Sequence, residues 1–519
     1  MKTFFENVNH LSVGKHSLIV LLATSAVLKF LIFGFSYDQA VNADGIRYIS
    51  AAQQFADGHF KEGLAIYPMP LYPLLIAAVH FLVPDWVLAA RMISYFSLVL
   101  AIIPLYLLTT DIFDRKAAFW ACLAFALAPF PNKWLMDVIR GPGFLFFFAW
   151  MVYFAQRTLR QPELKYFTGV VITFLIAVGF RIEGIVFFPV YFFFLLGLIV
   201  RVPQERSRFV KGILLWTAVP VILVVMVFVF VGPEAAYVNR IDQVIQEVNN
   251  LVHLRFLDTY HQIYQQLKAV EDQSPFTGLG KYNVVAIARH YMAVLYGFGL
   301  LEALIRVVFP FFVLPLVLSF KRPFSRQQMI ILALMIFYLL TLYYHALRVD
   351  FVRARFLLVP AFLLYPWVGA GLERLFERIY RSSMQTGLAI IFTILFIVAP
   401  LGKVARTVEK QNDVIVRAAK WIKAQPDLKN ARIVTNDPRI AFYAGRESYA
   451  RNRGDSVIYP IIRHDYGGIE SFALENRGDV IIVRISAKRL NQLPDFNNYI
   501  KVKEFEERKK VVIIFYSRK

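Results

Sequence analysis

The sequence is poor in cysteine and in charge. Cys122 is the one cysteine among 519 residues and lies inside an apolar run, so no intrachain disulfide can form. Only 18% of the residues are charged, and neither a basic block nor a stacking motif accompanies the formal net charge of +21, which argues against nucleic acid as a partner. The C-terminal region contains no Gly-x-Gly-x-x-Gly pattern and no P-loop, so nothing in it predicts nucleotide binding.

Apolar residues dominate instead. They make up 58% of the chain, with 49 Phe, and recur in runs close to the length of a bilayer span. This pattern excludes a soluble globular protein and predicts a polytopic α-helical membrane protein. The N-terminal apolar run continues to Phe35, which is too long for the core of a cleaved signal peptide, so we expect a retained signal anchor.

We expect about eleven transmembrane helices. Most of the surplus Lys and Arg lies in the short loops after the even-numbered spans, and placing these loops and the N-terminus inside satisfies the positive-inside rule throughout. The expected spans are 16–36, 88–110, 117–131, 141–156, 166–181, 184–200, 212–231, 290–318, 328–347, 355–372 and 385–402.

The other loops then face outward, at 37–87, 132–140, 181–184, 232–289 and 348–354. In the first of them, the proline-rich segment 67–73 leads into an apolar run ending at Val83, which is too short to span. We expect that run to form an interfacial helix on the outer leaflet, because counting it as a span would put the basic clusters outside.

The last part of the chain is polar and alternates helix-like and strand-like segments. Helical periodicity covers 413–424, buried strands are expected at 431–435, 479–483 and 511–516, and a short helix at 438–444. We therefore divide the chain into a transmembrane domain, 1–402, with large outer loops at 37–87 and 232–289, and an extracytoplasmic α/β domain, 403–519.

The outer loop 232–289 is rich in Gln, Asn, Tyr and His. Apolar residues at helical spacing, among them Val244, Val248 and Leu251, predict an amphipathic helix that caps the outer face. His253 and His261 are eight residues apart rather than three or four, so we do not expect them to bind a metal together.

The polar residues that attract attention fall on the outer face. An acid beside a bilayer is costly unless it faces water or a partner, so Asp44 is a functional candidate, with an exposed loop acid as the alternative. Arginine suits a lipid phosphate, because its planar fork binds phosphate and stays charged when partly buried. The alternative is a set of loop salt bridges, for example Arg181 with Glu183 or Asp137 with Arg140.

The order of these pieces resembles the GT-C membrane glycosyltransferases. The resemblance is greatest to the branch with the protein O-mannosyltransferases and lipid A aminoarabinose transferases, and it covers most of the chain. Met69 stands where the branch commonly has proline, and the second-loop acid is Asp137 where relatives often carry Glu. The segments that carry the resemblance are Asp44–Tyr48, Phe55–Gly58, Tyr67–Leu75, Arg91, Arg115–Lys116, Phe180–Ile185, Arg355–Pro360 and Val434–Arg446.

The resemblance implies an inverting transfer of a sugar from a polyprenyl-phosphate donor to an acceptor hydroxyl on the outer face of a bacterial inner membrane. Asp44 would be the general base, arginines would stabilise the leaving phosphate, and no covalent intermediate would be needed. The implied site residues are Asp44 and Asp137 for catalysis, Arg181, Arg355, Arg353 and Arg140 for the donor phosphate, and Tyr48, Glu183, Tyr67, Tyr72, Tyr344 and His345 for substrate.

No metal ligand is assigned, although the resemblance leaves room for a divalent cation, Mg or Mn. Membrane lipids and an unknown acceptor complete the expected partners. Two other readings stay open: a lipid-linked glycan transporter or flippase, against which the lack of internal repeats counts, and a non-catalytic scaffold of the same fold. The sequence contains no Trp-Trp-Asp motif, which argues against en bloc transfer of a glycan to asparagine.

Overall fold

A computed structural model describes residues 14, 16–231, 238–273, 283–320, 324–381, 385–408, 413–446, 456–458, 466–507 and 510–518. The chain forms two compact units. The helical unit consists of Met1–Lys29, Phe96–Asn132 and Arg140–Val404, and the mixed unit of Phe30–Tyr95, Lys133–Ile139 and Ala405–Lys519. Parts of the predicted outer loop, 232–237 and 274–282, lie outside the described residues.

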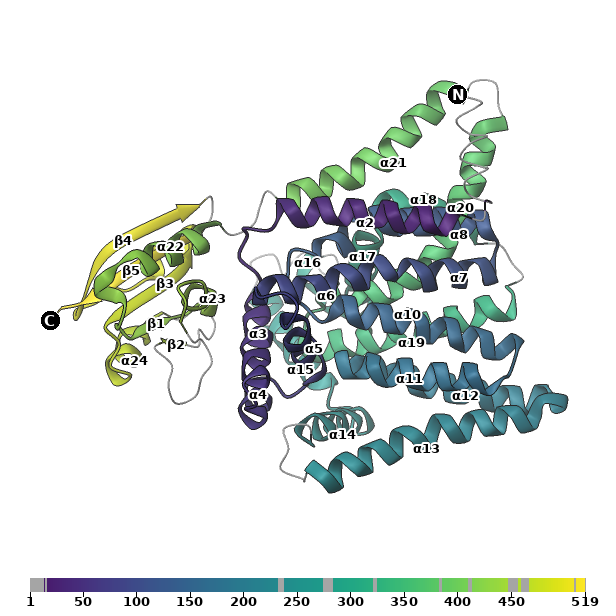
Figure 1. The fold of residues 1–519 in the computed structure, drawn as a ribbon, viewed down its shortest axis with the longest axis horizontal. Coiled ribbons are helices and arrows are strands. Elements are labelled where there is room, and N and C mark those ends of the chain that lie inside the picture. Colours follow the sequence, from purple (N-terminus) through teal and green to yellow (C-terminus); the bar gives the residue numbers. More distant parts are fainter. Residues whose placement is uncertain are drawn as a thin grey trace. The chain divides into compact units, whose positions relative to one another are not determined.

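The helical unit is a bundle of apolar helices (Figure 1). Helices α2 (Ser17–Phe35) and α6 (Trp86–Leu100) run from one unit into the other. The remaining elements are α7 (Ile102–Ile112), α8 (Arg115–Leu127), α9 (Pro129–Lys133), α10 (Gly141–Arg160), α11 (Leu164–Phe180), η1 (Ile182–Val186), α12 (Phe187–Arg201), η2 (Pro203–Glu205), α13 (Arg206–Val231), α14 (Val238–Val252), α15 (Leu257–Asp272), α16 (Val284–His290), α17 (Met292–Val308), η4 (Pro310–Phe312), α18 (Val313–Ser319), α19 (Arg326–Val349), η5 (Ala354–Leu357), α20 (Leu358–Arg381) and α21 (Gln385–Val408).

The protein is a multi-pass membrane protein. Among the described residues, six helical stretches are long and apolar enough to cross a bilayer, or seven if the bent pair α16–α17 is one span. Every predicted span overlaps a helix, but several of these helices are shorter or less apolar, so the count of eleven stays a prediction. The six are Ser17–Phe35, Trp86–Ile112, Ile182–Arg201, Pro203–Met226, Arg326–Val349 and Ala354–Ile379.

One predicted span is wrong in its continuity. Residues 290–318 do not form a single helix, because α17 ends at Val308 and Phe309 adopts a positive φ of 86°. Pro310 follows and opens η4. Proline lacks the backbone N–H that a continuing helix needs, which accounts for the break at this point.

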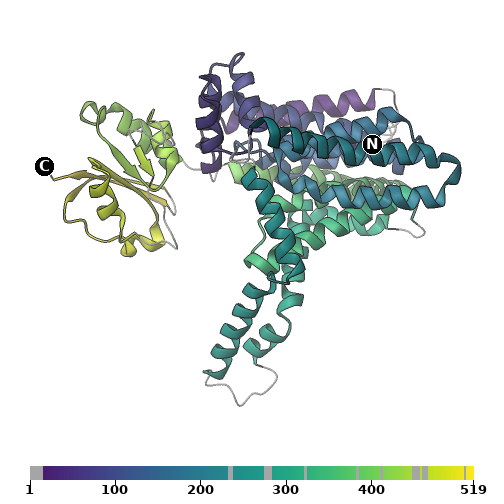
Figure 2. The ribbon, with the colours of Figure 1, turned by 90° about the horizontal axis from the view of Figure 1, so that it is seen from below.

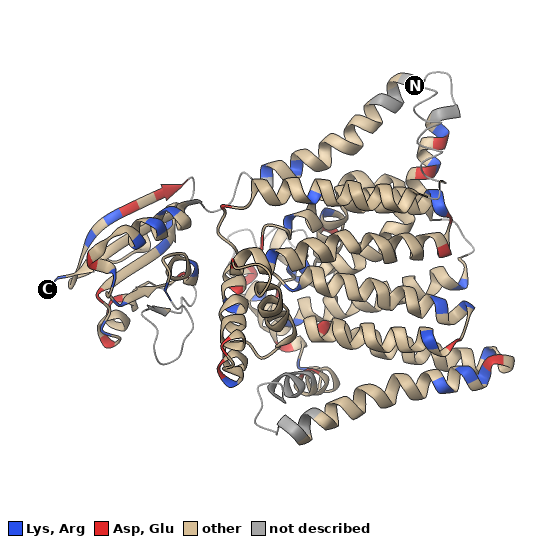
Figure 3. Ribbon diagram, in the orientation of Figure 1, with Lys and Arg blue, Asp and Glu red and all other residues tan. Residues whose placement is uncertain are grey.

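The charges follow the predicted loop pattern. The connections α7–α8, α10–α11 and α12–α13 all lie at one end of the bundle (Figure 1), and blue Lys and Arg segments gather at that end (Figure 3). Large apolar side chains on the bundle surface, such as Val221, Ile222 and Val225 of α13, are more than half exposed, as expected where helices face lipid.

The outer loop contains the predicted amphipathic helix. α14 exposes Ile245, Val248, Leu251 and Val252 on its surface. The next helix, α15, packs against α16, and this pair projects from the bundle (Figure 2).

The mixed unit begins with the first outer loop. It contains α3 (Ala43–Ala56), α4 (Phe60–Ile66) and α5 (Leu71–His80), and α3 packs against both of the others. α5 is the apolar helix expected on the outer leaflet, and at 10 residues it is too short to span.

The C-terminal part of the mixed unit is a five-stranded sheet with the order β2-β1-β3-β5-β4. β1 is parallel to β2 and β3, whereas β5 is antiparallel to β3 and β4. The elements are α22 (Asp413–Ala424), η6 (Pro426–Leu428), β1 (Ile433–Thr435), α23 (Pro438–Tyr443), β2 (Ser456–Ile458), α24 (Ile469–Glu475), β3 (Val480–Ser486), η7 (Ala487–Gln492), β4 (Tyr499–Glu507) and β5 (Lys510–Ser517).

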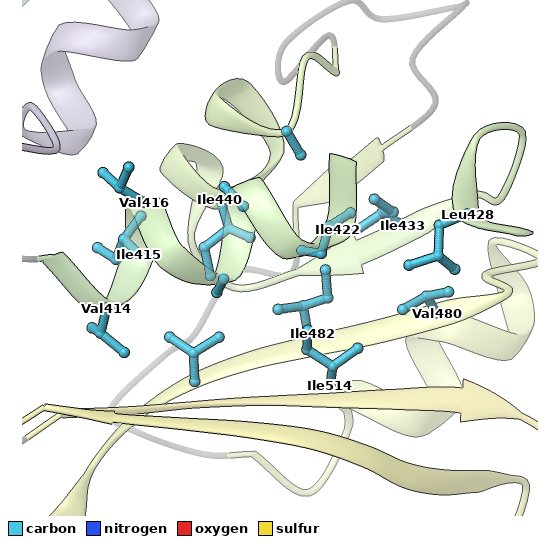
Figure 4. Packing of buried hydrophobic residues seen from close by; sticks show 14 of the residues in the cluster. Val414, Ile415, Val416, Ile422, Leu428, Ile433, Ile440, Val480, Ile482 and Ile514 are labelled. Atoms are coloured by element: carbon cyan, nitrogen blue, oxygen red, sulfur yellow. The ribbon is translucent and has the colours of Figure 1, made fainter. Parts of the chain in front are cut away.

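Alternation along the strands creates two cores. Val480 and Ile482 face the helices α22 and α23, where they pack with Val414, Ile440 and other residues (Figure 4). The intervening residues of β3 point to the opposite face and pack with α24. A strand buried on both faces reads as a continuous apolar run, which is why β3 was predictable from the sequence. The short β2, the exposed β4 and helix α24 were not predicted.

Candidate functional site

The first candidate, Asp44, lies exposed in the first turn of α3. Asn42 precedes this helix in extended conformation, but its side chain does not cap the helix. Its Oδ1 atom instead accepts a hydrogen bond of 2.9 Å from the backbone N–H of Val138. The residue next to Asp137 is thereby tied to the residues just before Asp44.

Gly45 allows the two segments to come this close. A Cβ atom at this position would lie 2.7 Å from the Cβ of Val138 and 2.9 Å from Oδ1 of Asn42. Both distances are shorter than van der Waals contact, so any larger residue would push the segments apart. The glycine that follows Asp44 therefore fixes the spacing between the two acid-bearing segments.

Arg91 fixes the same region from the other side. Its side chain is buried, and its Nη atoms donate hydrogen bonds to the carbonyl oxygens of Ser36, Tyr37 and Gln39 at 2.9–3.2 Å. A fourth bond, of 2.9 Å, reaches the carbonyl of Met136, directly before Asp137. One guanidinium thus joins the start of the first outer loop to the second, using the fork of donors that lysine lacks.

The two acids, Asp44 and Asp137, interact electrostatically and form what we call the carboxylate pair. Burial raises the pKa of the Asp137 carboxyl, and the negative charge of Asp44 acts in the same direction. The positive charges of Lys133, Arg91 and Arg439 oppose this rise. The structure therefore brings the two predicted catalytic residues together and gives them different surroundings, one exposed and one half-buried.

The three tyrosines predicted to contact substrate have a packing role. The ring of Tyr48 packs edge-on against Tyr67 and Tyr72, with centroids 4.8 and 5.4 Å apart. All three side chains are buried. They hold α3 against the chain around α5, and through α3 they support Asp44.

A second group of predicted residues lies in the helical unit, around the ring of Phe356. The guanidinium carbons of Arg181 and Arg355 lie 5.1 and 5.5 Å from its centroid, and the imidazole of His345 packs edge-on at 5.9 Å. Glu183 accepts a hydrogen bond of 2.7 Å from Nη2 of Arg181. We call these five residues the arginine cluster. The Arg181–Glu183 salt bridge considered from the sequence is confirmed.

Local structure explains why the cluster forms. α11 ends at Phe180, and Arg181 adopts extended backbone before the 3-10 turn η1, which carries Glu183. Nη1 of Arg140 donates a 3.0 Å hydrogen bond to the carbonyl of Phe180, so this third predicted arginine holds the end of α11. Arg355 comes from η5, a turn that also interrupts regular helix.

The remaining predicted residues lie elsewhere in the helical unit. Tyr344 packs on Phe256 and donates to Glu247 of α14, which also pairs with Arg348. Arg353 is exposed and lies over the ring of Phe351. Tyr344 and Arg348 thus attach α14 to the end of α19, outside the arginine cluster.

Within the described ranges, no group of three or more His, Cys, Asp or Glu side chains is arranged to hold a metal ion. The carboxylate pair supplies two such groups. These residues do not fit a metal held by protein ligands alone, and no chemical step below uses one.

Sequence reasoning missed the roles of Asn42, Gly45 and Arg91. The signal for Arg91 was present, because a single arginine within an apolar helix is unexpected unless it has partners. The roles of Asn42 and Gly45 depend on Val138, which is 96 residues away from Asn42, and no local pattern reports such a contact.

Comparisons with known proteins agree on the architecture. A family model described as dolichyl-phosphate-mannose-protein mannosyltransferase matches residues 67–231. Comparison with curated protein sequences finds no match. Similarity to solved structures extends over most of the chain.

ArnT from Cupriavidus metallidurans bound to undecaprenyl phosphate aligns over 96% of this chain and 98% of its own, with 13% identity and a TM-score of 0.54. The Archaeoglobus fulgidus oligosaccharyltransferase in the apo form aligns over 92% and 70%, with 13% identity and a TM-score of 0.57. The oligosaccharyltransferase AglB of the same organism, in complex with an inhibitory peptide and a dolichol-phosphate, aligns over 90% and 69%, with 14% identity and a TM-score of 0.55. The resemblance seen in the sequence is thus confirmed at the level of architecture, and the chain has the GT-C fold of membrane glycosyltransferases.

Proposed function

We propose that this protein is an inverting glycosyltransferase that moves a sugar from a polyprenyl-phosphate donor to an acceptor hydroxyl at the outer face of the membrane. The observation that carries the proposal is the carboxylate pair. Two acids 93 positions apart in the sequence are held together by Asn42, Gly45 and Arg91, and Asp44 is exposed where a substrate can reach it.

The chemistry requires one base. The acceptor oxygen attacks the anomeric carbon while its proton passes to the carboxylate of Asp44. The bond from the anomeric carbon to the phosphate oxygen breaks, and the lipid phosphate leaves with the bonding electrons. Because a single displacement inverts the anomeric centre, no protein nucleophile is needed. Asp137 is the second carboxylate beside the base.

The leaving phosphate gains negative charge as the bond breaks, and positively charged donors stabilise it. The arginine cluster of the helical unit contains two of the arginines predicted to bind the donor phosphate. Both Arg355 and Arg181 are candidates for direct phosphate contact, and Arg181 also donates to Glu183 through two nitrogen atoms. The donor class is supported by the undecaprenyl phosphate and dolichol-phosphate named with the structurally similar proteins. We assign the protein to a bacterial inner membrane, with the site facing outward.

The test uses purified full-length protein and a panel of undecaprenyl-phosphate sugars. Wild type is compared with Asp44→Asn, which keeps the shape of the side chain but cannot accept the proton. We expect turnover by wild type and a loss of about 100-fold or more in the variant, with donor binding unchanged. Asp57→Asn is the matched control, because Asp57 is an exposed acid at the other end of α3.

Two results would overturn parts of the proposal. Equal turnover by wild type and Asp44→Asn would remove Asp44 from the mechanism. Absence of both turnover and binding for every lipid-linked sugar would reject the transferase and favour a transporter or a scaffold.

A further inference from the structure

Arg439 lies in helix α23 of the C-terminal α/β region, and α23 packs against α3, the helix that carries Asp44. Arg439 and Asp137 each act on the charge of the other, although they are about 300 residues apart in the sequence. Arg439 is 7% exposed, so little water screens its charge. It belongs to the segment 434–446, which the sequence singled out and to which the proposed reaction assigns no role.

Asp437 holds the guanidinium of Arg439 in place. Its Oδ1 accepts from Nε of Arg439 at 2.8 Å and its Oδ2 from Nη2 at 2.5 Å, a bidentate pair. The same carboxylate caps α23 by accepting from the backbone N–H of Arg439, and it receives a further bond from Nη1 of Arg484. Two cations share one acid here, which leaves surplus positive charge beside Asp137.

Helix α23 is itself fixed to the first outer loop. The hydroxyl of Tyr443 accepts a 3.0 Å hydrogen bond from the backbone N–H of Val41, three residues before Asp44. Ala40 is buried in the same apolar cluster as Val414 and Ile440. α23 also packs against α3, the helix that carries Asp44. Arg439 is therefore held relative to both acids.

We propose that Arg439 is a positioning residue of the transfer reaction, which helps to hold Asp137 in place beside Asp44. The C-terminal α/β region is then part of the reaction site. This inference rests on the proposed function for its kinetic consequence, but the electrostatic interaction between the two residues can be tested without it.

Four charged groups act on Asp137. Asp44 disfavours its ionised form, and Lys133, Arg91 and Arg439 favour it. Lys133 and Arg91 act on Asp137 more strongly than Arg439 does, but Lys133 is exposed and Arg91 holds four carbonyls, so Arg439 is the one of the three that belongs to the C-terminal region. Burial raises the pKa of Asp137, so removing the charge of Arg439 should raise it further.

The kinetic test compares turnover against pH for wild type and Arg439→Gln. We expect the acidic limb of the profile to move to higher pH, because loss of this positive charge raises the pKa of Asp137, the carboxylate beside the base. Arg439→Lys, which keeps the positive charge, should return the acidic limb most of the way to its wild-type position. Lys423→Gln, which removes an exposed charge from α22 that does not act on Asp137, should leave the profile unchanged. An equal loss at every pH would show that Arg439 is only structural and would overturn the inference.

A double-mutant cycle tests the interaction between Arg439 and Asp137 without any need for activity. Melting temperatures of the full-length protein are measured for Arg439→Gln, Asp137→Asn and the double variant at pH 7. We expect the loss in the double variant to be smaller than the sum of the two single losses, because the second change removes a partner that is already gone. Additive losses would overturn the inference. If Arg439→Gln does not fold, Asp437→Asn replaces it, and coupling to Asp137→Asn must still appear.

Discussion

The carboxylate pair and the arginine cluster are built in different ways. Around the carboxylate pair, side chains bond to the backbone: Arg91 reaches four carbonyls and Asn42 an amide, so the positions of the chain segments themselves are fixed. In the arginine cluster, guanidinium groups lie against the ring of Phe356 and one of them pairs with Glu183. Four hydrogen bonds from Arg91 to carbonyl oxygens fix backbone segments. The contacts of the arginine cluster with a ring and a carboxylate join side chains only.

This difference suits the proposed chemistry. A base must stay within hydrogen-bond reach of the proton that it removes, and small displacements are costly in rate. Arginines that bind a lipid phosphate must instead admit a bulky donor and follow charge as it develops. The contrast predicts that changes near the carboxylate pair reduce stability and rate together, whereas changes in the arginine cluster chiefly affect donor binding.

The largest effect is expected for Arg91→Met. The apolar side chain fills similar space but leaves four carbonyls without their charged donor, at a cost of about 3–4 kcal/mol in the free energy of unfolding. Melting of the full-length protein measures this. Arg91→Lys should be intermediate, since an ammonium cannot reach all four acceptors. A change of less than about 2 °C for Arg91→Met would show that the clamp does not hold the acid segments.

The next effect concerns Asp437→Asn and depends on pH. Burial would raise the pKa of Asp437, but hydrogen bonds and charge from Arg439, with the charge of Arg484, outweigh burial and lower it. The folded-state pKa is below the ordinary value of 3.8, so the carboxylate stabilises the fold above pH 3.8, and this stability is lost as the pH falls through the lower folded value. We expect the variant to lose about 3 kcal/mol at neutral pH.

Melting measured from pH 7 downward checks this second prediction. The difference in melting temperature between wild type and Asp437→Asn should be constant near neutral pH. It should disappear as the pH falls below 3.8. Asp495→Asn is the matched control, an exposed acid of the same region, and should melt like wild type at each pH. A difference in melting temperature that does not change with pH would mean that the ion pairs of Asp437 contribute little to stability.

A smaller effect is expected in the arginine cluster. Arg355→Gln should weaken the binding of undecaprenyl phosphate by about 10- to 100-fold, the equivalent of one lost charge-assisted hydrogen bond, and should lower the melting temperature less than Arg91→Met does. Arg355→Lys should bind with an affinity between those of wild type and Arg355→Gln, because lysine keeps the charge but lacks the planar fork of donors. Binding by the purified protein in detergent measures this. A fall in melting temperature as large as that of Arg91→Met would erase the contrast between the two groups.

The smallest effect is expected for Arg348→Gln. Arg348 pairs with Glu247 outside the arginine cluster, and both side chains are more than one-third exposed. Exposed pairs contribute about 0–1 kcal/mol, so stability should change little. Donor binding assayed beside Arg355→Gln should stay near the wild-type value. Loss of binding here would extend the phosphate site to the end of α19.

The sequence predicted those features that depend on local pattern. Apolar runs located helices at all expected spans, and α22 has the bounds that its periodicity indicated. From the charges in the loops, the sequence predicts that Asp44 and Asp137 lie on the same, outer face. The break at Phe309 was missed, because a proline in a long apolar run does not by itself show whether a helix kinks or ends.

Contacts between distant segments could not be read from the sequence. Tyr48, Tyr67 and Tyr72 have polar ends and apolar rings, and the pattern could not decide between substrate contact and packing. The neighbourhood of Arg439 and Asp137 depends on how the C-terminal region folds against the first loop. The short strand β2 gave no usable pattern, since three residues are too few to show alternation.

The hydrogen bond between Val41 and Tyr443 has a consequence for biosynthesis. Its partners are 402 positions apart, so the loop that carries Asp44 is made early and its contact is made almost last. At roughly 5–20 residues per second, the ribosome needs about 20–80 s to supply the second partner. Throughout that interval the nascent chain carries Asp44 without its finished surroundings. Chains truncated before α23 should therefore insert into the membrane and remain inactive.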